Sequence, residues 1–285
     1  MNASFRFSMQ SPARAAFTLI ELLVVIAIIA ILAGMLLPSL GKAKDRALLA
    51  NDLSGIRQII LSATMFANDN QDYLPYSSWG DGDARDNWAH GAGIPLGNGK
   101  EGLAIWTNQV EFFKKGQLAP FIGTVNLLTC PKDFAERGSG KAKEDYKRRG
   151  IKITSFVWNG APNAFSSQDS KTPTSRFKLG QLRTTGILLW EAPEHENDYL
   201  FNDVGNQPHE GVSQRHGNGR RAKDQTDTGA GGIATFGNLS GASFTLNLKK
   251  WFSPEYAGKN VWPATANPVG PNDAYYNPAS KDGSY

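Results

Sequence analysis

Few side chains in this 285-residue sequence could bind a metal or catalyse a reaction. The four histidines form no helical i,i+4 pair and no H-E-x-x-H motif; they stand at positions 90, 195, 209 and 216. We therefore expect no dedicated transition-metal site, although His209, Glu210 and His216 could converge through a loop. Cys130 is the only cysteine, which excludes an intrachain disulfide and a cysteine-based zinc site and favours a buried structural thiol.

Three acidic residues lie close together in a Gly-rich stretch. Asp81, Asp83 and Asp86 follow one another at short spacing, and Asp72 is nearby. Carboxylate oxygens at such spacing suit calcium, which makes these residues the one cofactor candidate. Their spacing differs from the EF-hand pattern, and a solvated turn is the preferred interpretation.

No recognisable catalytic constellation is present, so we expect no enzyme activity. The sequence has no G-x-S-x-G, Walker A or dinucleotide-binding glycine pattern in a convincing context. Glu191, Glu194 and Glu196 are close in sequence, but glycosidase carboxylates must flank a cleft, and sequence alone does not place these so.

The charges do not favour nucleic-acid binding. Net charge is only +4, and two of those charges lie near the N-terminus, at Arg6 and Arg14. The basic clusters 141–149 and 215–223 contain or adjoin acids and glycines, which predicts solvated loops. The seven tryptophans could stack on carbohydrate, but they more often fill a β-rich core or brace loops; they stand at positions 79, 88, 106, 158, 190, 251 and 262.

The first structural element that the sequence predicts is a long apolar segment near the N-terminus. Phe17–Leu37 contains about the 20 apolar residues that a transmembrane helix needs, with Glu21 as its only charge. An ionisable group in such a segment usually marks function. The rest of the chain is soluble in character, with a mean hydropathy of −0.37 overall.

Cleavage could occur before this segment, after it, or not at all. The segment is long for a secretory h-region, and Met35 to Pro38 offer a poor cleavage context, which favours retention of the helix. Arg6 and Arg14 then favour a cytoplasmic N-terminus, although Lys42, Lys44 and Arg46 on the other flank weaken that inference.

The N-terminal region from Ala15 to Leu40 resembles the type IV prepilins and type II secretion pseudopilins. That family is cleaved before a Phe that becomes N-methylated, and it keeps a Glu at the fifth mature position. Phe17 and Glu21 match both positions, and Pro38 falls where many type IV pilins carry a helix-kinking proline. Ala16 stands where the family normally has Gly.

The resemblance gives Glu21 a physical role. After cleavage between Ala16 and Phe17, the terminal amine and the Glu21 carboxylate would lie on one helix face. A carboxylate in apolar surroundings is much less costly when it is paired with a cation. Glu21 of an incoming subunit could therefore pair with the Phe17 amine of its neighbour and set the axial register. In the alternative interpretation, Glu21 only reaches the lipid headgroups.

Helical character continues beyond the apolar segment. Residues 39–68 approximate the three-and-four spacing of an amphipathic helix, with charges between the apolar positions. Pro38 predicts a kink and Ser54-Gly55 a second soft point, and Asn68-Asp69-Asn70 predicts the helix end.

The remaining residues, 69–285, predict a β-rich globular domain. Short apolar runs separated by turn-rich segments predict strands at Val125–Thr129, Ile153–Trp158, Gly186–Glu191, Gly232–Phe236 and Ala242–Leu248. Gln109–Lys115 predicts one short helix. With most helix spent at the N-terminus, we expect an α+β, pilin-like fold: a long helix packed on a mainly antiparallel sheet.

Several local features resemble large pilin-like proteins of planctomycete and verrucomicrobial bacteria. They are Cys130–Asp133, Trp158–Gly160, Leu188–Glu191 and Arg215–Gly217. Those proteins usually continue into a strand with an Asp and a second His, whereas the corresponding stretch here, Ala234–Leu239, has neither.

The sequence thus predicts a structural subunit in four segments: a basic leader (1–16), a transmembrane and assembly helix (17–38), an amphipathic helix half (39–68) and a periplasmic or extracellular domain (69–285). The resemblance implies an inner-membrane protein with a cytoplasmic N-terminus, which assembles into a pilus or pseudopilus. Its implied partners are prepilin peptidase, other pilin subunits, an inner-membrane assembly platform and membrane lipid. The alternative is an unpolymerised, membrane-anchored module that binds glycan or another envelope ligand.

Overall fold

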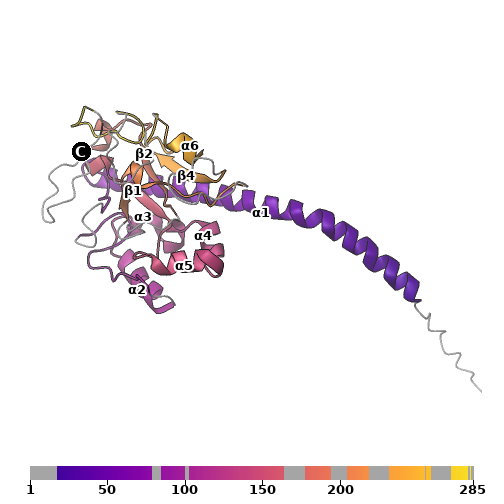
Figure 1. The fold of residues 1–285 in the computed structure, drawn as a ribbon. Coiled ribbons are helices and arrows are strands. Elements are labelled where there is room, and N and C mark those ends of the chain that lie inside the picture. The colour runs from indigo at the N-terminus through magenta and orange to yellow at the C-terminus, as the bar shows by residue number, and fades with distance from the viewer. Residues whose placement is uncertain are drawn as a thin grey trace, which may run out of the picture. The chain divides into compact units, whose positions relative to one another are not determined.

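The computed structural model describes residues 18–78, 85–99, 103–163, 177–193, 204–217, 231–253, 255–257, 271–281 and 283. They fall into two compact units on either side of the Lys44–Asp45 bond. The α-helices are α1 (Leu19–Asp69), α2 (Leu103–Phe113), α3 (Ala119–Ile122), α4 (Pro131–Glu136), α5 (Gly140–Arg148) and α6 (Leu248–Trp251) (Figure 1). The strands are β1 (Phe156–Asn159), β2 (Ile187–Glu191), β3 (Gly205–Asn206), β4 (Ile233–Asn238) and β5 (Ser243–Asn247).

The five strands form one mixed, mostly antiparallel sheet in the order β3-β1-β2-β4-β5. β2 pairs antiparallel with both β1 and β4, β4 pairs antiparallel with β5, and only the short β3 runs parallel to β1. Every residue of the central strand β2 is buried, as expected for a strand covered on both faces. The predicted α+β class with a long helix and a mainly antiparallel sheet is confirmed.

Helix α1 continues without a break through Pro38 and Gly55 and ends at Asp69, as the Asn68-Asp69-Asn70 signal predicted. From Asp45 onward it buries an apolar stripe that includes Ile56, Ile59, Ile60 and Ala63. These positions recur every three or four residues, so they lie on one side of the helix.

The stripe of α1 packs against strand β4 at a glycine. A Cβ atom added to Gly237 would lie 2.2 Å from Ile60 Cδ1 and 2.5 Å from Ile56 Cγ2. Both distances are far below van der Waals contact, so a side chain at this position would collide with the helix. Gly237 therefore sets how closely α1 approaches the sheet.

Four tryptophan side chains fill much of the hydrophobic core around the sheet. Trp88, Trp158, Trp190 and Trp251 are each fully buried. Trp88 stacks on Trp158 with 5.2 Å between ring centroids, and the Trp190 and Trp251 rings lie 5.3 Å apart. Indole N–H groups reach backbone carbonyls of loops: Trp88 bonds Val204, Trp190 bonds Gly211 and Trp251 bonds Pro208.

One predicted strand was wrong. Val125–Leu128 is a 3-10 helix rather than a strand, and the side chain of Thr124 accepts a hydrogen bond from the Asn126 N–H at its start. The long helix α1 holds most of the helical residues that the structure describes, and α2, α4 and α5 follow between 103 and 148 with loops between them. A short apolar run fits a strand and a buried helical turn equally well by periodicity.

The other strand predictions were close to the structure. β2, β4 and β5 match the predicted runs within two residues at each end. β1 begins later than predicted, at Phe156, because the Thr154 hydroxyl bonds both the N–H and the carbonyl of Phe156 and holds the preceding residues in a turn. The predicted short helix Gln109–Lys115 is the second half of α2.

Candidate functional site

The N-terminal end of α1 is closed by a capping box. The Thr18 side chain accepts a hydrogen bond from the Glu21 N–H at 3.2 Å, and Glu21 Oε2 accepts bonds from the Thr18 N–H at 2.9 Å and the Thr18 hydroxyl at 2.7 Å. Such reciprocal bonding satisfies N–H groups that the first helical turn leaves without partners. Glu21 therefore has a local structural role that was not predicted, although the T-x-x-E spacing signals it. Ala16 and Phe17 lie outside the described residues.

The helix that follows this cap exposes an apolar surface. Its large apolar side chains from Leu19 to Leu40 are between 46% and 77% exposed. It is the one helix in the described residues that is long and apolar enough to cross a membrane, with a mean hydropathy of 3.0 over the best 18-residue window and none of that window buried. Leucine and isoleucine at such density require a lipid or protein cover.

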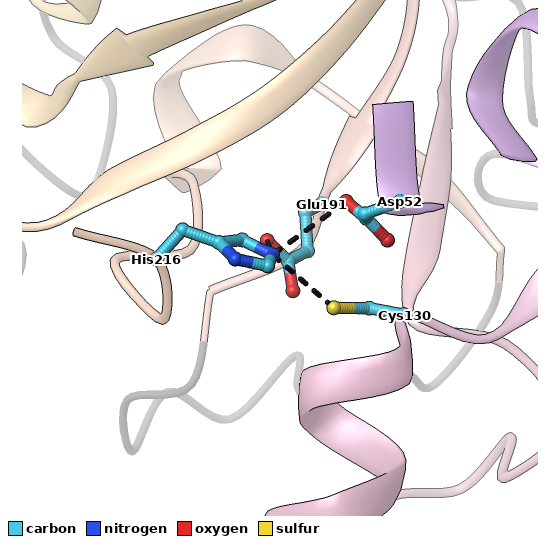
Figure 2. A group of neighbouring side chains, drawn as sticks. All are labelled: Asp52, Cys130, Glu191 and His216. Atoms are coloured by element: carbon cyan, nitrogen blue, oxygen red, sulfur yellow. Dashed lines mark hydrogen bonds and ion pairs between the residues drawn. The ribbon is translucent and has the colours of Figure 1, made fainter. Parts of the chain in front are cut away.

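A second group of chemically capable side chains lies inside the globular unit. Asp52, Cys130, Glu191 and His216 each offer a ligand atom, and these four atoms lie within 4.8 Å of one another. All four residues are buried. Figure 2 shows the four side chains converging from separate segments, with the His216 ring facing the other three. We call this group the buried quartet.

Four separate segments of the chain position the buried quartet. Asp52 lies on the buried face of α1, and Glu191 is the last residue of β2. Cys130 is the N-cap residue of α4, where its backbone N–H donates to Ser155 Oγ at 3.0 Å. His216 is held next to the sheet by a bridge to Ile233, the first residue of β4. The quartet therefore joins the long helix to the central strands.

His216 Nε2 lies at the centre of the quartet's contacts. It is 3.3 Å from Cys130 Sγ, 3.6 Å from Asp52 Oδ2 and 3.6 Å from Glu191 Oε2. The Thr235 hydroxyl donates to Asp52 Oδ2 at 2.5 Å. The other Asp52 oxygen, Oδ1, is buried and has no hydrogen-bond partner among the described residues.

A buried ion-pair network adjoins the quartet. Arg149 bonds both carboxylate oxygens of Asp133, at 2.6 and 2.9 Å, and the Ser155 hydroxyl donates to Asp133 at 2.6 Å. Arg215 bridges Asp133 at 3.1 Å and also bonds Glu191 Oε1. Burial opposes ionisation of Asp133, but the two guanidinium groups and these hydrogen bonds together hold its pKa well below the usual range.

The quartet's own pKa values respond to the same charges. Burial, with the nearby carboxylates of Glu191 and Asp52, raises the pKa of the Cys130 thiol well above its usual value. Burial lowers the pKa of His216, but Asp52 and Glu191 outweigh it, and the net shift is upward. With no ion bound, the thiol is therefore protonated, and the imidazole favours its charged form more than a free histidine does.

These contacts correct one prediction. The basic cluster 141–149 is not a solvated loop, because 140–148 forms helix α5 and Arg149 is buried in an ion pair with Asp133. Of the cluster 215–223, only Arg215 to Gly217 are described, and Arg215 is buried in ion pairs. His216 is a buried histidine. The exclusion of a cysteine-based zinc site stays a prediction, although one thiol can act with imidazole and carboxylate ligands drawn from distant segments.

The described aspartates of the predicted calcium loop accept hydrogen bonds from backbone N–H groups. Asp86 accepts a hydrogen bond from the Ala92 N–H at 2.8 Å, and Asp72 accepts one from the Gly180 N–H at 3.0 Å. Asp81 and Asp83 lie outside the described residues, as do Glu194, His195, Glu196 and two of the seven tryptophans. The calcium site stays a prediction.

A family model matches the N-terminal end of the chain. Residues 11–37 match the model of the prokaryotic N-terminal methylation motif. The match covers Ala16, Phe17 and Glu21 and supports a prepilin-type pilin or pseudopilin. It does not reach the globular unit, so the resemblance to the planctomycete and verrucomicrobial proteins stays a prediction. No curated protein and no solved structure is significantly similar to the chain.

Proposed function

We propose that the chain is a membrane-anchored structural subunit of a type IV pilus-like or type II secretion pseudopilus filament. The observation that carries the proposal is the N-terminal methylation motif at a helix whose large apolar side chains from Leu19 to Leu40 are exposed among the described residues. Prepilin peptidase cuts between Ala16 and Phe17 and methylates the new amine. Helix α1 then anchors the subunit in the inner membrane before it packs against other pilin-like subunits.

The capping box supports a specific role for Glu21 in this assembly. Both bonds from Thr18 go to Oε2, and Oε1 accepts no hydrogen bond among the described residues. The cap thus fixes the carboxylate at the end of the helix and leaves an oxygen for the amine of a neighbouring subunit. A paired carboxylate is far less costly in apolar surroundings than an unpaired one, so only the correct register is favourable.

The N-terminus of the protein from native membranes tests the processing step. Mass spectrometry of the N-terminal peptide should find N-methyl-Phe17 as the first residue. A chain that begins at Met1 would contradict processing, and one that begins beyond Leu37 would contradict a retained anchor as well.

Two substitutions separate the assembly role of Glu21 from its capping role. Glu21→Gln keeps a side chain that can complete a capping box but removes the charge, whereas Thr18→Val removes the two bonds of the Thr18 hydroxyl and keeps the charge. We expect Glu21→Gln to abolish incorporation into filaments and Thr18→Val to retain it. Glu111→Gln, at an exposed carboxylate on α2, is the matched control and should assemble normally.

Equal loss of incorporation in both helix variants would show that Glu21 acts only through the cap. Normal incorporation of Glu21→Gln would contradict the charge-pairing role. The alternative of an unpolymerised glycan-binding module loses its main support, because four of the five described tryptophans are fully buried.

A further inference from the structure

We infer that the buried quartet of Asp52, Cys130, Glu191 and His216 is a binding site for one divalent transition-metal ion of the zinc class. The site is independent of filament assembly and lies entirely within the globular unit. Its proposed role is structural: the ion joins helix α1 to strand β2 and to the segments that carry Cys130 and His216.

The distances from His216 Nε2 to the other three ligand atoms are close to those around a tetrahedral ion, and all four atoms lie within 4.8 Å of one another. Metal–ligand bonds of about 2.0–2.3 Å place tetrahedral ligands about 3.3–3.8 Å from one another. The three distances from His216 Nε2 are 3.3 Å to Cys130 Sγ and 3.6 Å to each carboxylate oxygen. A hydrogen-bonded carboxylate–imidazole pair would be closer, at about 2.7–2.9 Å. The two carboxylate–imidazole distances are therefore too long for direct hydrogen bonds and leave space for an ion, whereas the 3.3 Å between Cys130 Sγ and His216 Nε2 fits either a hydrogen bond or two ligands of one ion.

Asp52 provides an independent indication of a ligand. Its side chain is 0% exposed, and Oδ1 has no hydrogen-bond partner among the described residues. Figure 2 shows the Asp52 carboxylate turned toward the other three side chains. A buried carboxylate with an unpartnered oxygen is costly, and a cation bound to that carboxylate neutralises its charge and offsets part of the cost.

The buried carboxylates around the quartet also outnumber the buried guanidinium groups by one, which favours a bound cation. Three buried carboxylates, Asp52, Asp133 and Glu191, face two guanidinium groups, Arg149 and Arg215. The guanidinium groups contact Asp133 and Glu191, whereas the described ion-pair partner of Asp52 is His216 alone. A divalent ion held by the Cys130 thiolate supplies the one missing positive charge. A protonated His216 would supply it as well, and the experiment must distinguish these two states.

The donor types select the class of ion. Thiolate and imidazole ligands suit zinc and its neighbours, while calcium and magnesium prefer oxygen ligands alone. Four protein ligands in a buried site form a closed coordination shell, which is typical of structural rather than catalytic zinc. The Thr235 hydroxyl on Asp52 and the Arg215 guanidinium on Glu191 would orient the carboxylates from outside that shell.

A pocket of about 430 Å³ adjoins the quartet. It is lined by Asp52 and by Pro131, the residue after Cys130, and also by Phe134 and Phe156. Because all four ligand residues are buried, the ion would bind as the globular unit folds.

Cobalt provides the direct test. The full-length chain, purified in detergent and treated with chelator, is titrated with Co²⁺ and then with Zn²⁺. We expect one Co²⁺ per chain, with the visible bands of tetrahedral Co²⁺ and a near-ultraviolet thiolate-to-cobalt band, both lost when Zn²⁺ displaces it. If the folded wild-type chain binds neither ion, the quartet is a metal-free polar network. If it binds Co²⁺ without the thiolate band, the ion lies away from Cys130. Either result would overturn the inference.

Variants assign the ligands. Cys130→Ser and His216→Gln should each lower Co²⁺ affinity by more than about tenfold, and Thr235→Val should lower it by about tenfold or more through Asp52. His209→Gln, a change at a buried histidine outside the quartet, is the matched control and should bind as the wild type does. Unchanged affinity in both Cys130→Ser and His216→Gln would place the ion elsewhere. If a ligand variant fails to fold, the wild-type cobalt spectrum decides the question.

Discussion

Replacing Gly237 with alanine tests how α1 is held against the sheet. The new Cβ would lie 2.2 Å from Ile60 Cδ1, 2.5 Å from Ile56 Cγ2 and 3.0 Å from Leu189 Cδ2. Adding a methyl group to a well-packed core usually costs about 1–3 kcal/mol, and the two shortest contacts place this substitution toward the upper end. Such a loss is a large fraction of the roughly 5–15 kcal/mol that stabilises a typical domain.

A second substitution identifies the collision. Ile60→Val removes Cδ1, the atom nearest the new methyl group, and should by itself cost about 0.5–1.5 kcal/mol. In the Gly237→Ala background the same change relieves the clash. The double variant should therefore lose less unfolding free energy than the two single variants lose together, by at least about 0.5 kcal/mol.

Urea unfolding of the full chain in detergent, followed by tryptophan fluorescence, measures these changes. Trp158, Trp190 and Trp251 are fully buried and report loss of the core. With a slope of about 1–3 kcal/mol per molar urea, Gly237→Ala should lower the midpoint by about 1 M. Gly138→Ala is the control, because nothing lies within 4 Å of its added Cβ. Additive effects of the two substitutions would refute the proposed contact between α1 and β4.

Three further predictions concern the buried ion pairs, the pH response and processing. Arg149→Met should destabilise the fold by about 3–5 kcal/mol in urea unfolding, because Asp133 loses its bidentate partner; a loss below about 1 kcal/mol would contradict this. Burial lowers the pKa of His209 to about 4, so from about pH 6.5 down to pH 4 the unfolded chain binds a proton that the folded chain does not. Stability should therefore fall with decreasing pH across that window, and His209→Gln should flatten the stability profile. If prepilin peptidase processes the chain, Ala16→Gly should increase the fraction cut before Phe17 in pulse-labelled membranes, and an unchanged fraction would show that Ala16 is fully accepted.

Local patterns in the sequence were sufficient for the elements that depend on neighbouring residues. The apolar run after Phe17, the helix end at Asp69 and strand β2 all follow from spacing and turn residues within a short window. The capping box was equally local and could have been predicted from Thr18 and Glu21. The segment at Val125 was mispredicted because apolar character alone does not distinguish a short strand from a helical turn.

By itself, then, the sequence determined the N-terminal segment that carries the methylation motif, the long helix and the α+β class, because these depend on contacts along the chain. Only the tertiary structure brought the quartet together: Cys130 and His216 are 86 residues apart, and Asp52 meets Thr235 across 183 residues. Tertiary packing also turned Arg149 and Arg215 from expected surface charges into buried partners of Asp133. Sheet pairing and the packing of α1 decide such distances, and no spacing within a single segment encodes them.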